Sequence, residues 1–254
     1  ITAAYTEKIL DPWHDQYISP DIYPNLKPYP RQTDGLTAVL QTGKEPFKWS
    51  DATLKFKNPD KNNLVIYELW VHDFCPARSI KGVINRLDYL QNLGVNVIEL
   101  MPICEFDGNI SWGYNPHHYF APDKAYGTPE DYKTLVDEAH KRGMAVILDM
   151  VFNQADGKHP FVQLYRTDDY NGKDNPWINS KPANFPEYKP DFNHDSPATQ
   201  EYFKRVLKYW LQEYKVDGYR MDLTKGFCGP TCVSANRVKV INDYYNAAKS
   251  VRSD

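Results

Sequence analysis

The sequence predicts an α/β fold with parallel strands and crossover helices, and three observations support this prediction. From Leu64 onward, short β-prone runs alternate with segments whose apolar residues recur at helical spacing. The runs are almost continuously apolar, which is typical of strands buried on both faces. Polar residues gather directly after these runs, at the strand ends where (β/α)8 barrels place their sites. Because no glycine-rich phosphate turn follows the first strand, the barrel is favoured over a doubly wound sheet.

Residues 1–60 differ in character from the rest of the chain. Pro12 and Pro46 are among the prolines that interrupt this segment, and its apolar residues come in short runs. We expect a β-rich or irregular segment here, either the tail of a β-sandwich domain or a linker. The polar cluster at 58–63 marks the boundary, and residues 61–254 are expected to form a partial barrel.

Four strand–helix units are expected after this boundary. Strands are predicted at 64–71, 95–100, 144–150 and 216–222, and helices at about 79–94, 128–143, 196–214 and 236–251. Ser79 and Gly94 are the expected caps of the first helix, and Thr128 followed by Pro129 begins the second. A long polar loop at about 153–195 separates the third strand from its helix. The chain is therefore expected to contain about the first four units of a (β/α)8 barrel.

The bulk composition argues against nucleic acid as a partner and against a membrane-spanning helix. The net charge is −3 and the pI about 6.2, so the chain has no basic surface of the kind that binds nucleic acid. No apolar run approaches the roughly 20 residues that a membrane-spanning helix needs. The aromatic content of 14%, with 19 Tyr and 6 Trp, suits a surface that stacks on sugar rings, although aromatic residues also fill cores.

The four cysteines are too few for a disulfide scaffold. Cys228 and Cys232 are close enough in sequence to pair or to bind a metal. No second close pair completes a zinc site, so free thiols are expected.

Arg220 and Asp222 form the first candidate site. They lie two positions apart in a β-prone run, so in a strand their side chains face the same way. A fixed guanidinium favours the ionised form of a neighbouring carboxyl group, which is the form a carboxylate nucleophile needs. A structural ion pair at a strand end is the alternative, and these residues alone do not decide between the two.

The loop after the second strand and the end of the third strand contain further candidates. Trp112, Tyr114 and His118 offer aromatic faces and donors for a polyhydroxylated ring, or they only fix their own loop. Asp149 ends the third strand, and it is placed to orient the arginine or to bind a hard cation through oxygen. The acids of the long loop are expected to be mostly solvated: Asp168, Asp169, Asp174, Asp191 and Asp195.

Five segments of the chain resemble the successive signature segments of the α-amylase family, glycoside hydrolase family 13, in the family's order. They are Gly94–Pro102, Trp112–Tyr114, Tyr126–Thr128, Asp149–Asn153 and Asp217–Lys225. The resemblance implies a (β/α)8 barrel with a long excursion after the third strand, and retaining cleavage or transfer at α-glucosidic bonds. The proline-rich N-terminal part resembles family members with a β-sandwich ahead of the barrel, such as branching enzymes and pullulanase-like proteins.

The resemblance also implies a role for each matching residue. Asp222 matches the catalytic nucleophile and Arg220 the arginine that holds it ionised. Tyr114 matches the aromatic platform under the sugar at the cleavage point, and Asp149 the aspartate that braces the arginine. Lys225 lies where a lysine often contacts the sugar beyond the cleavage point.

Three positions concern a cation or depart from the family pattern. Asn153 falls where many members place a calcium ligand, so Ca²⁺ is an expected cofactor. Gln154 replaces a histidine that hydrogen-bonds the sugar; glutamine can still donate to a hydroxyl group but cannot carry a positive charge. Gly226 replaces the histidine that often follows the lysine.

The leading hypothesis is an α-glucan-active retaining hydrolase that cleaves starch or maltooligosaccharides, with this chain bearing the nucleophile. The family's acid glutamate ends a later strand that the sequence does not include, so this segment alone is expected to be inactive and to need the remaining barrel half. The alternatives are a branching or debranching transglycosylase, a glucan-binding member without activity, suggested by Gln154, and an unrelated barrel that binds a metal through Asp149. Export to a secreted or periplasmic location is favoured.

Overall fold

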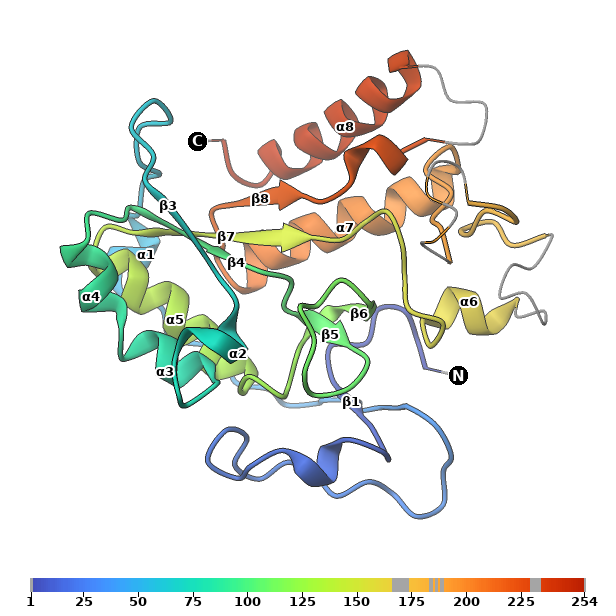
Figure 1. Ribbon diagram of the computed structural model, residues 1–254, viewed down its shortest axis with the longest axis horizontal. Helices are drawn as coiled ribbons and strands as arrows, with labels where there is room; N and C mark the ends of the chain where they lie inside the picture. The colour runs from blue at the N-terminus through green and yellow to red at the C-terminus, as the bar shows by residue number, and fades with distance from the viewer. Residues whose placement is uncertain are drawn as a thin grey trace.

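The computed structural model describes residues 2–165, 174–182, 185, 187, 190–228 and 234–253 (Figure 1). Its elements in chain order are β1 (Ile9–Leu10), η1 (Asp15–Tyr17), β2 (Thr37–Ala38), α1 (Asp51–Leu54), β3 (Ile66–Leu69), α2 (Val71–Phe74), α3 (Ile80–Ile84), α4 (Leu87–Asn92), β4 (Val97–Leu100), β5 (Cys104–Phe106), β6 (Pro116–Pro122), α5 (Pro129–Lys141), β7 (Ala145–Met150), α6 (Pro160–Leu164), α7 (Pro197–Glu213), β8 (Gly218–Met221), η2 (Thr224–Gly226) and α8 (Ser234–Lys249). None of the helices in these ranges has the length and apolarity that crossing a membrane requires.

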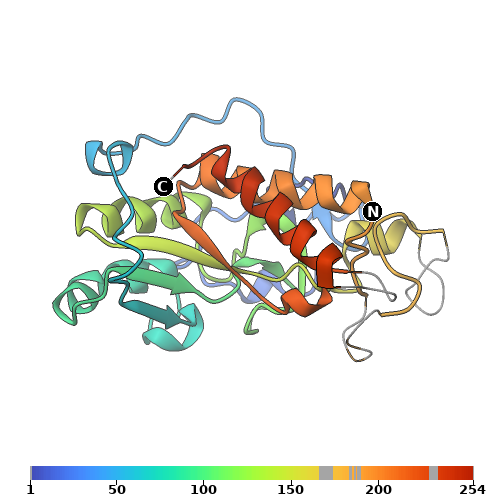
Figure 2. The same ribbon diagram turned by 90° about the horizontal axis from the view of Figure 1, so that it is seen from above.

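Four parallel strands form the central sheet in the order β3-β4-β7-β8, which is also their order along the chain. Helices lie between successive strands, so each connection is a crossover of the kind that barrels repeat. In Figures 1 and 2, α3 and α4 lie at the β3 end of the sheet, while α7 and α8 pack against each other at the β8 end. The predicted α/β class and the four strand–helix units are confirmed.

Local sequence signals explain the long helices. In α5, the Thr128 side chain accepts a hydrogen bond from the Asp131 amide at 3.1 Å, and the Asp131 carboxylate accepts one from the Thr128 amide at 2.9 Å. This reciprocal capping satisfies two amides that the first turn leaves without helical partners. Helix α7 buries Phe203, Leu207 and Trp210 completely, and each such side chain stabilises the fold by about 2 kcal/mol.

The two faces of the sheet differ in burial. Side chains such as Ile98, Leu100 and Leu148 face the helices and are buried. Glu68 and Glu99 alternate with them on the opposite face and are more exposed. A closed barrel turns this second face inward.

Two parts of the barrel region differ from the sequence prediction. The helix expected at 79–94 is divided into α3 and α4, although Ser79 caps its start as predicted, accepting from the Gly82 amide at 3.3 Å. The antiparallel hairpin β5–β6 was not predicted. Pro116 and Pro122 bound strand β6, and prolines at such positions weaken the sequence signal of a strand.

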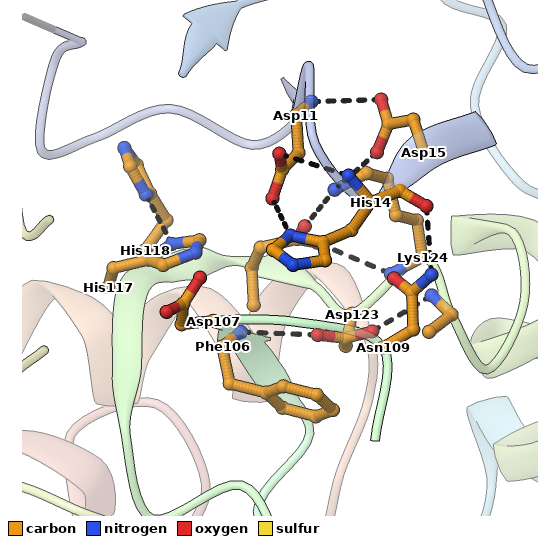
Figure 3. A network of polar contacts seen from close by, with 12 residues as sticks. Asp11, His14, Asp15, Phe106, Asp107, Asn109, His117, His118, Asp123 and Lys124 are labelled. Carbon is orange, nitrogen blue, oxygen red and sulfur yellow. Dashed lines mark hydrogen bonds and ion pairs between the residues drawn. The ribbon is translucent and has the colours of Figure 1, made fainter. Parts of the chain in front are cut away.

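The N-terminal segment packs against this hairpin through a buried charge network (Figure 3). Lys124 lies at the end of β6 and is buried; its ammonium pairs with Asp15 of η1 at 3.1 Å and with Glu105 of β5. Burial opposes the charge, but Glu105 and Asp15 raise the pKa of Lys124 above its usual value. Within residues 2–60, the β structure is limited to the two-residue pairing of β1 with β2.

The cysteines only partly follow the sequence prediction. Cys75 and Cys104 are free and buried, as expected. Cys228 is disulfide-bonded, so the prediction of a free thiol is wrong at this position. Its partner is not among the described residues, and Cys232 lies outside them.

Candidate active site

The register of the last two strands builds the site. Asp149 of β7 lies directly opposite Arg220 of β8, so both side chains emerge from the same face at neighbouring positions. Asp222 follows β8, and its amide donates to the Met150 carbonyl at 3.0 Å, which prolongs the strand pairing. All three residues therefore lie at the carboxyl end of the sheet, the end at which barrels place their catalytic groups.

Arg220 holds two carboxylates at once. Its Nη1 atom is 3.0 Å from both oxygens of Asp149 and 2.6 Å from Oδ1 of Asp222. Partial burial opposes its charge, but the hydrogen bond to Asp222 and the charge of Asp149 raise the pKa of Arg220 further above its ordinary value. Asp222 is nearly buried, with 12% of its side chain exposed. The predicted arginine–aspartate pair is present, with its side chains facing each other.

Asp149 is fully buried and fixes the arginine. Burial raises the pKa of its carboxyl group, while the hydrogen bond from Tyr114 and the charge of Arg220 act in the opposite direction. Tyr114 donates its hydroxyl hydrogen to Asp149 Oδ2 at 2.8 Å. Burial and this hydrogen bond raise the pKa of Tyr114, so the phenol keeps its proton and remains a donor.

The position of Tyr114 depends on a close backbone approach. Gly113 has a φ of +90°, and a Cβ atom at this position would lie 2.2 Å from the Pro102 carbonyl oxygen. Only glycine tolerates both conditions. The loop after β4 therefore folds back onto the strand end, which places Tyr114 against Asp149.

Gln154 contacts the backbone of Tyr114, and Asn153 contacts Gln154. Gln154 is buried, donates its Nε2 to the Tyr114 carbonyl at 3.0 Å and accepts from Asn153 Nδ2 at 2.8 Å. The protein itself therefore uses both ends of the Gln154 amide. Asn153 Oδ1 is buried and has no hydrogen-bond partner among the residues that the structure describes. A Cβ at Gly226 would lie 1.5 Å from this oxygen, so a histidine at position 226 would require Asn153 to move.

Three further predicted residues lie apart from this group. Trp112 is 63% exposed and meets Trp70 edge to face, with ring centroids 6.4 Å apart. Lys225 is exposed, with its ammonium 5.6 Å from the ring of Phe185. His118 is fully buried, and its ring contacts the N-terminal segment, with Nε2 2.6 Å from Thr2 Oγ1. The structure does not bring His118 to the other site residues.

The acids of the long loop have different environments. Asp168 and Asp169 lie outside the described residues, and Asp174 and Asp195 are exposed as expected. Asp191 is buried, contrary to the general expectation for these acids. Its backbone pairs with Gln154, and its Oδ2 accepts from Asn179 Nδ2 at 2.7 Å. This contact places a carboxylate of the long loop next to the segment that contains Asn153.

Sequence reasoning missed two acids of the inner face. Carboxylate oxygens of Glu68, Glu99 and Asp149 all lie within 4.8 Å of one another. Burial, followed by the charges of Glu68 and Asp149, raises the pKa of Glu99. The sequence offered a signal for these two acids: each stands within an apolar strand, at a position whose side chain faces away from the apolar neighbours. Such positions share one face of a parallel sheet.

Comparison with known proteins gives consistent results. The family model described as "Alpha amylase, catalytic domain" matches residues 53–184. Malto-oligosyltrehalose trehalohydrolase of Saccharolobus solfataricus is 36% identical over 203 residues, covering 75% of this chain and 32% of the relative. Isoamylase 1, chloroplastic, of Arabidopsis thaliana is 32% identical over 255 residues, covering 85% and 32%. The crystal structure of a putative alpha amylase from Salmonella typhimurium superposes with a TM-score of 0.68 at 28% identity, covering 88% of this chain and 35% of that one. The chain thus spans about a third of the length of the curated relatives that it matches.

Proposed function

Because the chain belongs to the α-amylase family of glycoside hydrolases, we propose that it bears the nucleophile of a retaining hydrolase that cleaves α-glucans such as starch or maltooligosaccharides. One observation supports this above the others: Asp222 lies 2.6 Å from Arg220 at the carboxyl end of the sheet, and the same guanidinium is braced by the buried Asp149. A carboxylate held in this way by a cationic partner is fixed in one orientation, and covalent catalysis requires a positioned nucleophile.

In the proposed reaction, Tyr114 stacks against the glucose unit at the cleavage point. An oxygen of Asp222 attacks the anomeric carbon, the glycosidic bond breaks, and a covalent glycosyl–enzyme forms. Arg220 orients the Asp222 carboxylate before attack and is itself held by Asp149. Tyr114 is coupled to this clamp through its hydrogen bond to Asp149, so the platform and the nucleophile keep a fixed relative position.

The reaction needs a second carboxyl group, roughly 5 Å from the nucleophile, to protonate the leaving oxygen. Glu68 and Glu99 lie against Asp149 on the inner face of the strands, so we do not assign them this role. We propose that the general acid comes from a part of the protein outside these residues.

A mechanism-based label tests the assignment. The full-length protein is incubated with a fluorinated α-glucosyl fluoride, whose glycosyl–enzyme breaks down slowly, and digested for mass spectrometry. We expect the label on Asp222, and none in Asp222→Asn. The control is Asp243→Asn, a surface carboxylate paired with Lys239 at 2.9 Å, which should be labelled like the unchanged protein. A label on any other side chain would exclude Asp222 as nucleophile.

Cleavage of branch points is the second candidate, since relatives named isoamylase and a solved structure titled as a debranching enzyme are among the matches. Product analysis discriminates between the two. Rapid loss of branch points from amylopectin with little shortening of unbranched amylose indicates debranching, and the reverse indicates an amylase-type reaction.

We also propose Ca²⁺ as a cofactor bound near Asn153. The buried Asn153 Oδ1, without a hydrogen bond among the residues described, is the kind of oxygen that Ca²⁺ accepts as a ligand. Asp191, buried on the segment paired with Gln154, offers a carboxylate nearby. The ion would fasten the long loop to the end of β7 and take no part in bond cleavage. Added Ca²⁺ should raise the melting temperature of the unchanged protein relative to a chelator, and this difference should shrink in Asn153→Ala.

A further inference from the structure

Trp13 is an exposed aromatic residue that the proposed active site does not use. It lies in the N-terminal segment and keeps 46% of its surface exposed. The ammonium of Lys158 lies 4.5 Å from the ring centroid and covers one side of the indole. The indole N–H has no hydrogen-bond partner in the described parts of the chain. A large apolar face and a free donor therefore remain available.

Polar groups lie on the residues next to Trp13 and Lys158. Lys158 forms an ion pair with Asp107, and oxygens of Asp107 and Asp11 lie within 4.8 Å of a ring nitrogen of His14. Asn109 donates to the His14 carbonyl at 2.8 Å, which fixes the β5–β6 loop against the N-terminal segment. Figure 3 shows Asp11, His14, Asp107 and Asn109 gathered at this contact. An ammonium thus lies against the indole ring, and carboxylates contact Lys158 and His14, the residue that follows Trp13.

Trp13 contacts a loop that leaves the end of the sheet where the nucleophile lies. Lys158 belongs to the loop that follows the carboxyl end of β7. Asp107 belongs to the β5–β6 turn, which lies in the connection that follows the carboxyl end of β4. The Asp107 carbonyl also accepts from Asn115 Nδ2 at 3.3 Å, and Asn115 follows Tyr114. A connected set of contacts therefore joins Trp13 to the residue under the cleaved sugar.

We propose that Trp13, bordered by Lys158, Asp107 and His14, is an outer binding site for a glucan chain whose cleaved bond lies at Tyr114. The inference rests on the proposed function. The C–H faces of glucose stack on an indole, and its hydroxyl groups need both donors and acceptors at close range, which the ammonium and the carboxylate supply. The two aspartates and the net charge of −3 disfavour a polyanion such as nucleic acid.

Tyr17 provides a matched control. It lies in the same segment and is 74% exposed, but no ammonium of the described residues covers its ring. If any exposed aromatic residue of the segment sufficed, replacing Tyr17 would weaken glucan binding as much as replacing Trp13.

The experiment measures glucan affinity in the full-length protein, made inactive by Asp222→Asn. Gel retardation measures binding to amylopectin, and calorimetry measures binding to maltotriose. We expect Trp13→Ala to raise the Kd for amylopectin by about three- to tenfold, the range of one aromatic stacking contact, while maltotriose affinity stays unchanged. Trp13→Phe should retain most of the affinity and Tyr17→Ala all of it. Lys158→Met, which leaves the indole in place, should weaken amylopectin binding by about twofold and serves as a second variant if Trp13→Ala does not fold.

The outcomes separate the inference from the proposed function. If maltotriose binds in a manner that depends on Tyr114, but Trp13→Ala retains full amylopectin affinity, the inference is wrong and the proposed function stands. If neither ligand binds the inactive protein, the proposed function is wrong and the inference falls with it. Retardation on a β-glucan that equals that on amylopectin and also depends on Trp13 would overturn the assignment to α-glucans.

Discussion

Strand β8 has an aspartate at each end, and the two are held in different ways. Asp217, before the strand, accepts from the Val146 amide at 2.7 Å and contacts His140 Nε2 at 2.8 Å; Arg252 pairs with its other oxygen at 2.6 Å. The carboxylate of Asp222, after the strand, has Arg220 as its only hydrogen-bond partner among the residues described. The Asp217 carboxylate has two hydrogen-bond partners on one oxygen and an ion pair on the other, whereas among the residues described Asp222 has a partner on one oxygen.

The contacts of Asp217 continue into a buried network at the amino end of the sheet. His140 Nδ1 lies 3.0 Å from Thr53 Oγ1, and Thr53 donates to Asp137 at 2.7 Å. Asp137 also accepts from the amide and the hydroxyl group of Ser50, at 2.9 and 2.8 Å. The network fixes α1 and α5 to the start of β8, so we infer that its role is stability.

The difference teaches how to separate structural from chemical carboxylates in this fold. A buried carboxylate with protein partners at both oxygens has no free side for a ligand, and the fold loses stability when this residue is changed. A carboxylate with a fixed partner on one side and a free oxygen on the other can react. The strand end at which an aspartate lies therefore predicts whether its substitution lowers stability or catalytic activity.

The largest expected effect is on catalysis. Asp222→Asn removes the attacking anion, so kcat/KM of the full-length protein on maltooligosaccharides should fall by about 10³–10⁵-fold. The melting temperature should change little, because a single ion pair is lost at the strand end. Asp243→Asn is the control, and an Asp222→Asn protein of near-normal activity would contradict the comparison.

The next effect is on stability. Asp217→Asn leaves His140 and Arg252 without their anionic partner inside the protein, so the free energy of unfolding should fall by about 3 kcal/mol. Urea unfolding measures it. Activity per folded molecule should stay within about twofold of the unchanged protein. A strong loss of kcat without loss of stability would show that the two strand ends are not separable in this way.

The pH dependence of stability tests the structural role of the network that includes Asp217 and Asp137. Burial alone would raise the pKa of Asp137, but hydrogen bonds from Thr53 and Ser50 lower it to about 2, below the ordinary value of 3.8. Since the folded pKa is depressed, the carboxylate stabilises the protein above pH 3.8, and this contribution disappears as the pH falls towards 2. At neutral pH it amounts to about 2 kcal/mol.

Asp137→Asn should therefore be less stable than the unchanged protein at pH 7 and nearly equal to it at pH 2. Acid and thermal unfolding of the two proteins at matched pH values measures this. A stability difference that is independent of pH would show that the lost packing, and not the ionised carboxylate, is responsible.

The smallest expected effect concerns the platform. Tyr114→Phe keeps the aromatic ring but removes the hydrogen bond to Asp149, so kcat/KM should fall by about tenfold. Tyr17→Phe, on the exposed N-terminal segment, should have no effect. An unchanged kcat/KM in Tyr114→Phe would show that Arg220 is positioned without help from the tyrosine.

The strands, the capped helices and the arginine–aspartate pair could be predicted because their signals are local. The Thr128 cap and the alternation that places Arg220 and Asp222 on one face both follow from a few neighbouring residues. Packing at long range then only had to bring Asp149 opposite Arg220, which the parallel register does.

Other features depend on contacts between distant segments and could not be predicted. Gln154 donates to the backbone of Tyr114, and the His118 ring contacts the N-terminal segment. Both contacts depend on how the β5–β6 hairpin packs against segments that are distant in the sequence. Asp191 is buried by its pairing with Gln154, which no spacing in the loop indicates.

The buried ammonium of Lys124 determines where this protein can be shortened. It is enclosed between Glu105 and Asp15, and Asp15 belongs to a segment that precedes the apparent boundary near residue 60. A chain that starts at that boundary would open this pocket to water and remove Asp15, one of the anions that offset the desolvation of the lysine. Truncation should therefore leave at least the residues from Ile9 onward in place, and the first helical turn after them is better treated as part of the barrel than as an appendage.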